Sequence, residues 1–148
     1  VRNLVDFAGA NISFSWDIIC GFPGETENLF DETLELVRET KPIKIHAFPF
    51  SPRPDTVAAS MPKQINRYVS KQRVKTITDI ANKNHIEFMQ TQIGKIVQVL
   101  VEENNVARCP HDIPVKIIGE QIPAKTVCDV HLIDICGNCF VGQPIIDK

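Results

Sequence analysis

The sequence of 148 residues predicts an α/β unit, then a long helix, then a small antiparallel β-barrel. Three observations predict this order. A short apolar run at 17–20 ends in a glycine-rich turn and leads into a helical period, as in a βαβ unit. Apolar residues recur at helical spacing over 63–91. After residue 94, short β-branched segments alternate with Asn, Gly and Pro turns, which is typical of a small barrel.

The first elements follow from local signals. A buried strand is expected at Asp17–Cys20, where it ends in the turn Gly21–Gly24. Thr26 is a candidate N-cap for a helix that Pro42 stops, and acidic residues in its first turns suit the helix dipole. Alternation over 43–47 predicts the second strand of the βαβ unit, with a right-handed crossover.

The later elements complete three predicted domains. Three prolines make 51–62 an ordered loop, and a helix over 63–91 ends before Gly94. Strands are expected at 96–101, 115–118, 127–135 and 140–145. The predicted domains are 1–62, 63–91 and 92–148.

Composition limits the protein class. Hydrophobic residues make up 43% of the chain and charged residues 23%, values that fit a globular protein rather than a disordered one. No apolar run approaches the ~18 residues of a membrane helix, so we expect no membrane partner. The odd count of five cysteines and the lack of a signal peptide favour free thiols in the cytoplasm.

Charge is unevenly distributed along the chain. Residues 1–40 hold two basic and eight acidic residues, a net charge of −6. Residues 41–90 hold nine basic and three acidic residues, a net charge of +6. Residues 91–148 hold five basic and seven acidic residues, a net charge of −2. The basic middle fits either a polyanion-binding surface or an ordinary solvated helix face.

The turn after the first strand is the strongest candidate site. In parallel α/β sheets, ligands bind outside the carboxyl ends of the strands. Gly21 and Gly24 permit a close backbone approach, Pro23 stiffens the turn, and the next helix offers free N–H groups. A nucleotide-like ligand fits this pattern, and so does a plain capped βα turn.

The end of the second strand carries complementary side chains. Phe48 and Phe50 are suited to packing against a flat ring, and Arg53 is suited to a carboxylate or phosphate. The alternative is that the phenylalanines are core and that Arg53 tethers the loop. His46 is more simply explained as structural than as a base.

Three segments of the chain resemble the radical S-adenosylmethionine (SAM) methylthiotransferases that modify tRNA. They read DIICGFPGET at 17–26, HAFPFSPRPDT at 46–56 and IGKIVQVLVEE at 93–103. Within that family the chain looks most like the branch that acts on threonylcarbamoyladenosine at position 37. The resemblance implies the last βα units of a radical SAM partial TIM barrel at 1–62, a connecting helix, and a TRAM domain, a small RNA-binding β-barrel, at 92–148.

The resemblance also implies cofactors, a substrate and site residues. Such enzymes bind SAM and two [4Fe–4S] clusters, and a radical derived from SAM starts the addition of a methylthio group to C2 of the adenosine. Residues implied to line the SAM site are Gly21, Phe22, Pro23, Gly24, Glu25, Phe48 and Pro49. If RNA binds, the cations we expect to contact it are Arg53, Lys95, Arg108 and Lys116.

The chain departs from the family in its cysteines. It has no CxxxCxxC motif, and a [4Fe–4S] cluster needs three or four thiolates. We therefore expect the cluster ligands on a preceding segment, which becomes a second partner beside tRNA, and we expect this chain alone to be inactive. The hypotheses left open are a portion of a larger enzyme, a split-gene product, a non-catalytic RNA-binding module and a remnant.

Two smaller features carry expectations. Cys136 and Cys139 form half a zinc site, but two other Cys/His pairs compete for the second half, so we predict no metal and a structural role. Asp55 stands where the family usually has glycine and carries a modest penalty if the loop needs a positive φ. RNA binding by 92–148 rests mainly on the resemblance, because this segment is acidic overall.

Overall fold

The structure is a computed structural model that describes residues 13–145. The chain divides into two compact units, Val1–His85 and Ile86–Lys148, and each is described by itself. Within residues 13–145, no helix is both long enough and apolar enough to cross a membrane.

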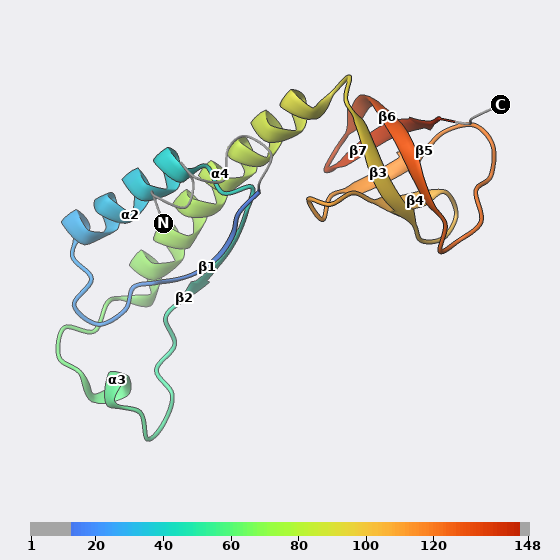
Figure 1. Cartoon of the computed structure of the whole chain (residues 1–148). Coiled ribbons are helices and arrows are strands. Elements are labelled where there is room, and N and C mark those ends of the chain that lie inside the picture. The colour runs from blue at the N-terminus through green and yellow to red at the C-terminus, as the bar shows by residue number, and fades with distance from the viewer. Residues whose placement is uncertain (1–12, 146–148) are drawn as a thin grey trace. The chain divides into compact units, whose positions relative to one another are not determined.

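The first unit is built from two strands, with its two longer helices along one face of them (Figure 1). Its elements are β1 (Ser15–Cys20), α2 (Glu27–Thr40), β2 (Lys44–Pro49), α3 (Val57–Ser60) and the first part of α4 (Arg67–Gln92). The predicted strand, helix and strand over 17–47 are therefore confirmed, with slightly longer strands. The two-stranded sheet does not by itself show the radical SAM partial barrel that the resemblance implied.

β1 and β2 pair in parallel, with Cys20 opposite Pro49 in the register. The connection holds α2, whose N-cap is Thr26: its hydroxyl accepts a hydrogen bond from the Leu29 N–H at 3.3 Å. At the other end Lys41 adopts a left-handed conformation and its N–H donates to the Val37 carbonyl. Thr26 is the N-cap that the sequence predicted.

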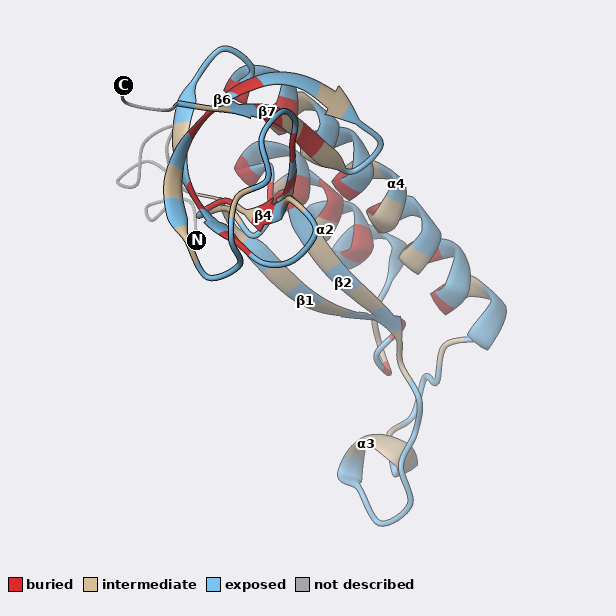
Figure 2. Cartoon of the chain, turned by 90° about the vertical axis from the view of Figure 1, so that its right-hand side faces the viewer, coloured by how far each residue is buried: buried red, intermediate tan, exposed pale blue. Residues whose placement is uncertain are grey.

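One face of this sheet is buried against α2 and α4, as the burial colours of Figure 2 show. The fully buried members of the core are Cys20, Phe30, Leu34 and Ile77. The other face is exposed and carries Ile19 and Phe48, which lie opposite each other in the register. Apolar residues thus remain open to solvent at the carboxyl end of both strands.

The segment between β2 and α4 differs from the prediction in two ways. The expected loop contains the short helix α3, because the Thr56 hydroxyl accepts the Ala59 N–H at 3.3 Å and caps it. The predicted helix at 63–91 begins later, at Arg67, because Lys63 takes a positive φ of 60° that a helix does not allow. Asp55 also has a positive φ, 63°, as the glycine usual in the family would suggest.

The second unit is a closed five-stranded barrel in the order β3-β4-β5-β7-β6. Its strands are β3 (Ile96–Val101), β4 (Val106–Arg108), β5 (Pro114–Ile117), β6 (Val127–Cys136) and β7 (Cys139–Pro144). The strands predicted at 96–101, 115–118, 127–135 and 140–145 are all present. β4 was missed because three residues are too short for a periodic signal.

The expectation of a purely antiparallel barrel is wrong in one ladder. β5 and β7 pair in parallel, with Val115 opposite Phe140. This parallel pair closes the barrel: β7 pairs antiparallel with β6 on one side and parallel with β5 on the other. Gly142 lies at this closure: a Cβ there would come 2.2 Å from Val130 Cγ1.

Candidate functional site

The loops after β1 and β2 meet at one edge of the first unit. The Phe50 N–H donates to the Cys20 carbonyl at 2.7 Å, which joins the two strand ends. The Phe22 and Phe50 rings lie 5.3 Å apart, edge to face at 72°. The structure therefore brings together the two sequence segments that were singled out separately.

A buried arginine on α4 holds the first of these loops. Arg73 Nη1 lies 2.5 Å from Glu25 Oε2 and 3.1 Å from the Glu25 carbonyl, and Nη2 lies 2.5 Å from Glu27 Oε1. Glu25 Oε2 also accepts the Gly21 N–H at 2.5 Å. The Arg73 guanidinium sits 5.0 Å from the centroid of the Phe30 ring. The Glu25 carboxylate thus connects Gly21, at the start of the turn, to Arg73 on α4.

The two ends of this network differ in exposure. The Arg73 side chain is 5% exposed and that of Glu25 is 16% exposed, whereas that of Glu27 is 75% exposed. Burial lowers the pKa of Arg73, but its hydrogen bonds with Glu27 and Glu25 raise the pKa above the usual value. Arg73 is therefore a permanent cation, and Glu25 is engaged inside the protein.

The two glycines of the turn have different neighbours. At Gly21 (φ 79°) a Cβ would lie 1.9 Å from Ser70 Oγ, so the close approach it permits is to α4. At Gly24 (φ 88°) a Cβ would meet no atom within 4 Å. Its N–H donates to the Lys63 carbonyl at 3.0 Å. Of the two, Gly24 is the one with open space for a ligand.

The remaining candidates divide by exposure. Pro23 is buried and packs within the turn, whereas Phe22 is 43% exposed and Phe48 is 54% exposed. Pro49 is half-buried. Exposed aromatic faces beside an open glycine backbone can hold a flat, uncharged ring system such as a nucleobase.

One potentially reactive group near these loops, the thiol of Cys20, is poorly suited to catalysis. Burial raises the pKa of the Cys20 thiol to about 11, with a further rise from the charge of Glu25 that Arg73 partly offsets. A thiol this far from ionisation is not a nucleophile at neutral pH. His46 lies on the exposed face of β2, one strand position away from Ala47 in the core.

Arg53 lies on the exposed loop after β2. A surface cavity of about 420 Å³ lies beside the root of this loop. The residues that line the cavity are Phe50, Ser51, Pro52, Gln64, Ile65 and Arg67. Because Phe50 also contacts Phe22, the cavity adjoins the meeting point of the two strand ends.

The barrel cations predicted to meet tRNA are differently placed. Arg108 is held by two carboxylates, Glu102 at 3.1 Å and Asp112 at 3.0 Å, so its charge is largely compensated. Lys95 Nζ donates to the Gln92 side chain at 3.2 Å. Lys116 is exposed on β5.

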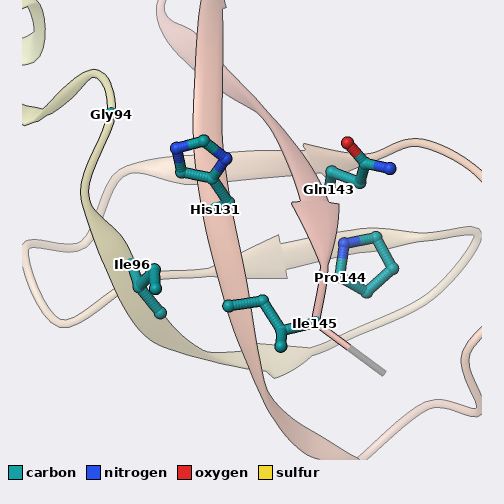
Figure 3. Close-up of a pocket in the computed structure, with 6 residues that line it drawn as sticks. All are labelled: Gly94, Ile96, His131, Gln143, Pro144 and Ile145. Atoms are coloured by element: carbon teal, nitrogen blue, oxygen red, sulfur yellow. The ribbon is translucent and has the colours of Figure 1, made fainter. Parts of the chain in front are cut away.

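The barrel carries its own surface cavity of about 280 Å³ (Figure 3). It is lined by Gly94, Ile96, His131, Gln143, Pro144 and Ile145. The His131 ring and the Ile96 and Ile145 side chains lie around this hollow in Figure 3. Its lining is mostly apolar and neutral, so no specific chemistry follows from it.

The cysteines form no metal centre in the part of the chain that the structure describes. All five are free. Cys136 and Cys139 face each other at the β6–β7 hairpin, where the Cys139 thiol donates to the Cys136 carbonyl at 2.9 Å. Across residues 13–145, no group of three or more His, Cys, Asp or Glu residues could hold a metal ion. These residues therefore do not fit an iron–sulfur cluster.

Sequence reasoning missed two residues that shape the site, Arg73 and Ser70. Both lie on α4, far along the chain from the turn that they contact. The available signal was a charged residue at a position that the helical period places among apolar ones, since Arg73 precedes the buried Ile77 by one turn.

Comparison with known proteins gives a consistent group of relatives, although no protein-family model matches the chain. The chain is 32% identical over 142 residues to a tRNA-2-methylthio-N(6)-dimethylallyladenosine synthase of Bartonella bacilliformis, covering 92% of the chain and 31% of the relative. It is 40% identical over 121 residues to a threonylcarbamoyladenosine tRNA methylthiotransferase of Rickettsia prowazekii, covering 78% and 28%.

A third relative is a tRNA-2-methylthio-N(6)-dimethylallyladenosine synthase of Tropheryma whipplei, 45% identical over 91 residues. That match covers 62% of this chain and 19% of the relative. The chain spans about a third of the length of its Bartonella bacilliformis relative. Both substrate branches occur among these relatives.

Proposed function

Since the chain is homologous to the C-terminal part of the tRNA methylthiotransferases, we propose that it supplies one wall of a SAM site and an RNA-contacting barrel to such an enzyme. The enzyme would add a methylthio group to C2 of a modified adenosine at position 37 of tRNA. In this proposal β1 and β2 are the last strands of a radical SAM partial barrel, and the second unit is a TRAM-like domain. A tRNA substrate agrees with the cytoplasmic location expected from the cysteines.

The observation that carries the proposal is the meeting of two loops at the carboxyl ends of parallel strands. Phe22 and Phe50 touch there, and no atom lies within 4 Å of the place where a Cβ of Gly24 would stand. This is the edge at which α/β sheets bind nucleotides. The exposed rings of Phe22 and Phe48 are suited to packing against the adenine of SAM, and the Gly24 backbone can approach its ribose closely.

The chain's own residues bind and orient in this proposal. SAM, when bound, would supply the radical that starts the reaction at C2 of the adenosine. Glu25 and Arg73 keep the Gly21–Glu25 turn in one conformation, so the ligand does not have to order it on binding. The iron–sulfur ligands must come from another segment, because the described cysteines do not fit a cluster.

The experiment is modification of tRNA by the whole enzyme that carries this chain. That enzyme is expressed in a bacterial strain lacking tRNA methylthiolation, and nucleosides from its tRNA are measured by mass spectrometry. We expect a methylthio adenosine to appear with the intact enzyme and to be lost with Gly24→Val. Its mass identifies the branch, threonylcarbamoyl as the sequence predicts or dimethylallyl. Unmodified tRNA from an enzyme shown to carry both clusters would overturn the proposal.

A non-catalytic RNA-binding module is the second candidate, favoured by the closed barrel with its own core. The same strain separates the two functions. An enzyme that binds tRNA but leaves it unmodified, with clusters and SAM present, would favour the binding module.

A further inference from the structure

We propose that the chain has a tRNA-binding surface on its first unit, outside the barrel, which takes a single-stranded stretch of the RNA. We call it the loop–helix surface; it comprises Arg53, Lys63, Arg67, Tyr68 and Lys71, from the loop after β2 and the first turns of α4. The proposal rests on the proposed function, because it takes tRNA to be the substrate.

The charges of this surface are free. Arg53, Lys63, Arg67 and Lys71 are all exposed, and none forms an ion pair in the structure described here. Between residues 51 and 72 the sequence holds one acidic residue, Asp55. Unpaired cations are available to phosphate groups, and their binding releases the counterions of the RNA.

The helix presents two of these cations on one side. Arg67 and Lys71 are four residues apart, so they lie one above the other along α4. Ser70 and Arg73 lie off this row and are buried. The next cation along the row, Lys75, is already paired with Asp79 at 3.1 Å. The free positive charge is thus confined to the first two turns of the helix.

An aromatic side chain stands among these cations. Tyr68 follows Arg67 directly and is 70% exposed. Burying an aromatic ring is favourable, so a ring left this open beside free cations is suited to stacking with an unpaired base. Clustered cations and a ring that stacks with bases are features by which proteins bind single-stranded nucleic acid.

The surface adjoins the strand ends where the chemistry is proposed. Arg67 lines the cavity of about 420 Å³ that Phe50 also lines, and Phe50 contacts Phe22. The Lys63 carbonyl accepts the N–H of Gly24 at 3.0 Å. A nucleotide strand lying on Lys63 and Arg67 would pass directly beside the turn proposed to hold SAM. This fits a role in delivering the loop that contains the target adenosine.

The barrel is a weaker electrostatic partner than this surface. Its Arg108 is compensated by Glu102 and Asp112, and residues 91–148 carry a net charge of −2. Free cations bind other polyanions too, so heparin and anionic vesicles belong in the test. Heparin and anionic lipids have no bases, so stacking on Tyr68 distinguishes RNA binding from the binding of these polyanions.

The first experiment measures the affinity of the 148-residue chain for a fluorescent tRNA anticodon stem-loop by anisotropy, over a series of salt concentrations. The surface variant is Arg53→Gln, Lys63→Gln, Arg67→Gln and Lys71→Gln together. The matched barrel variant removes four charges as well: Lys95→Gln, Arg108→Gln, Lys116→Gln and Lys125→Gln. Two of the barrel side chains form side-chain hydrogen bonds: Lys95 donates to Gln92, and Arg108 donates to Glu102 and Asp112.

We expect the surface variant to bind at least about tenfold more weakly than the barrel variant. We also expect the slope of log K against log salt to flatten by about 3, since each phosphate contact to a single strand contributes about 0.7. A larger loss in the barrel variant, or no salt-dependent binding by the unaltered chain, would overturn the proposal.

The second experiment isolates the ring. Tyr68→Ala should weaken stem-loop binding about tenfold, the equivalent of one stacked base, and leave heparin and anionic-vesicle binding unchanged. Tyr68→Phe, which keeps the ring, should retain the affinity for RNA. Equal losses on RNA and heparin, or no loss on RNA, would contradict an RNA surface. Methylthiolation of tRNA by the whole enzyme is measured separately. If that enzyme is active and its surface variant binds tRNA as tightly as the unaltered enzyme, the loop–helix surface is refuted and the proposed function is not.

Discussion

The two units of the chain hold their shape in different ways. The barrel joins its five strands into a closed ring and fills it with apolar side chains, among them Val115, Leu132 and Phe140. The first unit has a two-stranded sheet, and its turn after β1 depends on the buried charges of Arg73 and Glu25. Apolar packing inside a closed ring therefore stabilises the barrel, whereas one ion-pair network stabilises the turn proposed to bind the cofactor.

The largest expected effect in this comparison comes from Arg73. Arg73→Met leaves the Glu25 carboxylate without its cation in a place that is 16% exposed, which should lower the free energy of unfolding of the first unit by about 3–5 kcal/mol. The measurement is urea unfolding followed by the fluorescence of Trp16, the one tryptophan of the chain, which lies in β1.

The matched control for this variant is Arg108→Met in the barrel. Arg108 also contacts two carboxylates, but its side chain is 40% exposed, so we expect a loss below about 1 kcal/mol. Equal losses from the two variants would mean that burial does not distinguish the networks.

The next effect separates the two glycines of the turn. Gly21→Ala adds a Cβ that would lie 1.9 Å from Ser70 Oγ at a φ of 79°, and should cost about 2–4 kcal/mol through overpacking and strain. Gly24→Ala meets open space and should cost only about 1 kcal/mol of strain. Urea unfolding checks both values, and a greater loss for Gly24→Ala would reverse the assigned roles.

Thiol reactivity offers a third comparison between the units. Burial raises the pKa of Cys20 to about 11, while Cys136 is exposed at the β6–β7 hairpin. A rise of two pKa units from the ordinary thiol value lowers the thiolate fraction of Cys20 about 100-fold. Burial also slows the access of the reagent to this thiol. Iodoacetamide labelling at pH 8, read by peptide mass spectrometry, should modify Cys136 at least about 100-fold faster. Rapid labelling of Cys20 in the folded chain would show that the core around it opens easily.

The smallest effect concerns the pH dependence of the second unit. Burial, with a further contribution from the charge of Lys95, lowers the pKa of His111, whose ring packs 4.8 Å from that of Phe88. Above about pH 6.5 the histidine is neutral in both states. As the pH falls below that value, the unfolded chain takes up the proton first, and stability is lost until the folded pKa is passed.

His111→Gln should remove that part of the acid loss. The measurement compares urea midpoints at pH 7.5 and 5.5 for the two proteins, using circular dichroism of the barrel strands. A variant whose midpoint falls as much as that of the unaltered chain would show that other groups cause the acid sensitivity.

Local signals predicted most of the elements but not the contacts between distant ones. Thr26 capping, the parallel strands and four of the five barrel strands followed from spacing and turn residues. The start of α4 at Arg67 and the parallel β5–β7 ladder did not, since one depends on a positive φ at Lys63 and the other on closing the barrel.

Local signals likewise predicted the two loops of the candidate site but not their contacts with α4. Its two loops were identified because each ends a strand, and in a parallel pair both ends lie at one edge. The sequence could not reveal that Glu25 is engaged by Arg73, which lies 48 residues away along the chain. It also could not separate Gly21, which packs on Ser70, from Gly24, which faces open space.

The adenosyl group of SAM is proposed to bind in the open space beside Gly24, against the exposed rings of Phe22 and Phe48. Equilibrium dialysis of labelled SAM against the whole enzyme carrying this chain tests this proposal most directly. The variant is Gly24→Val, and the control is Gly137→Val in the barrel, also at a positive φ, 62°, with open space around it. We expect Gly24→Val to weaken SAM binding at least about tenfold and Gly137→Val to leave it unchanged. Equal SAM affinity in a folded Gly24→Val enzyme would contradict the account.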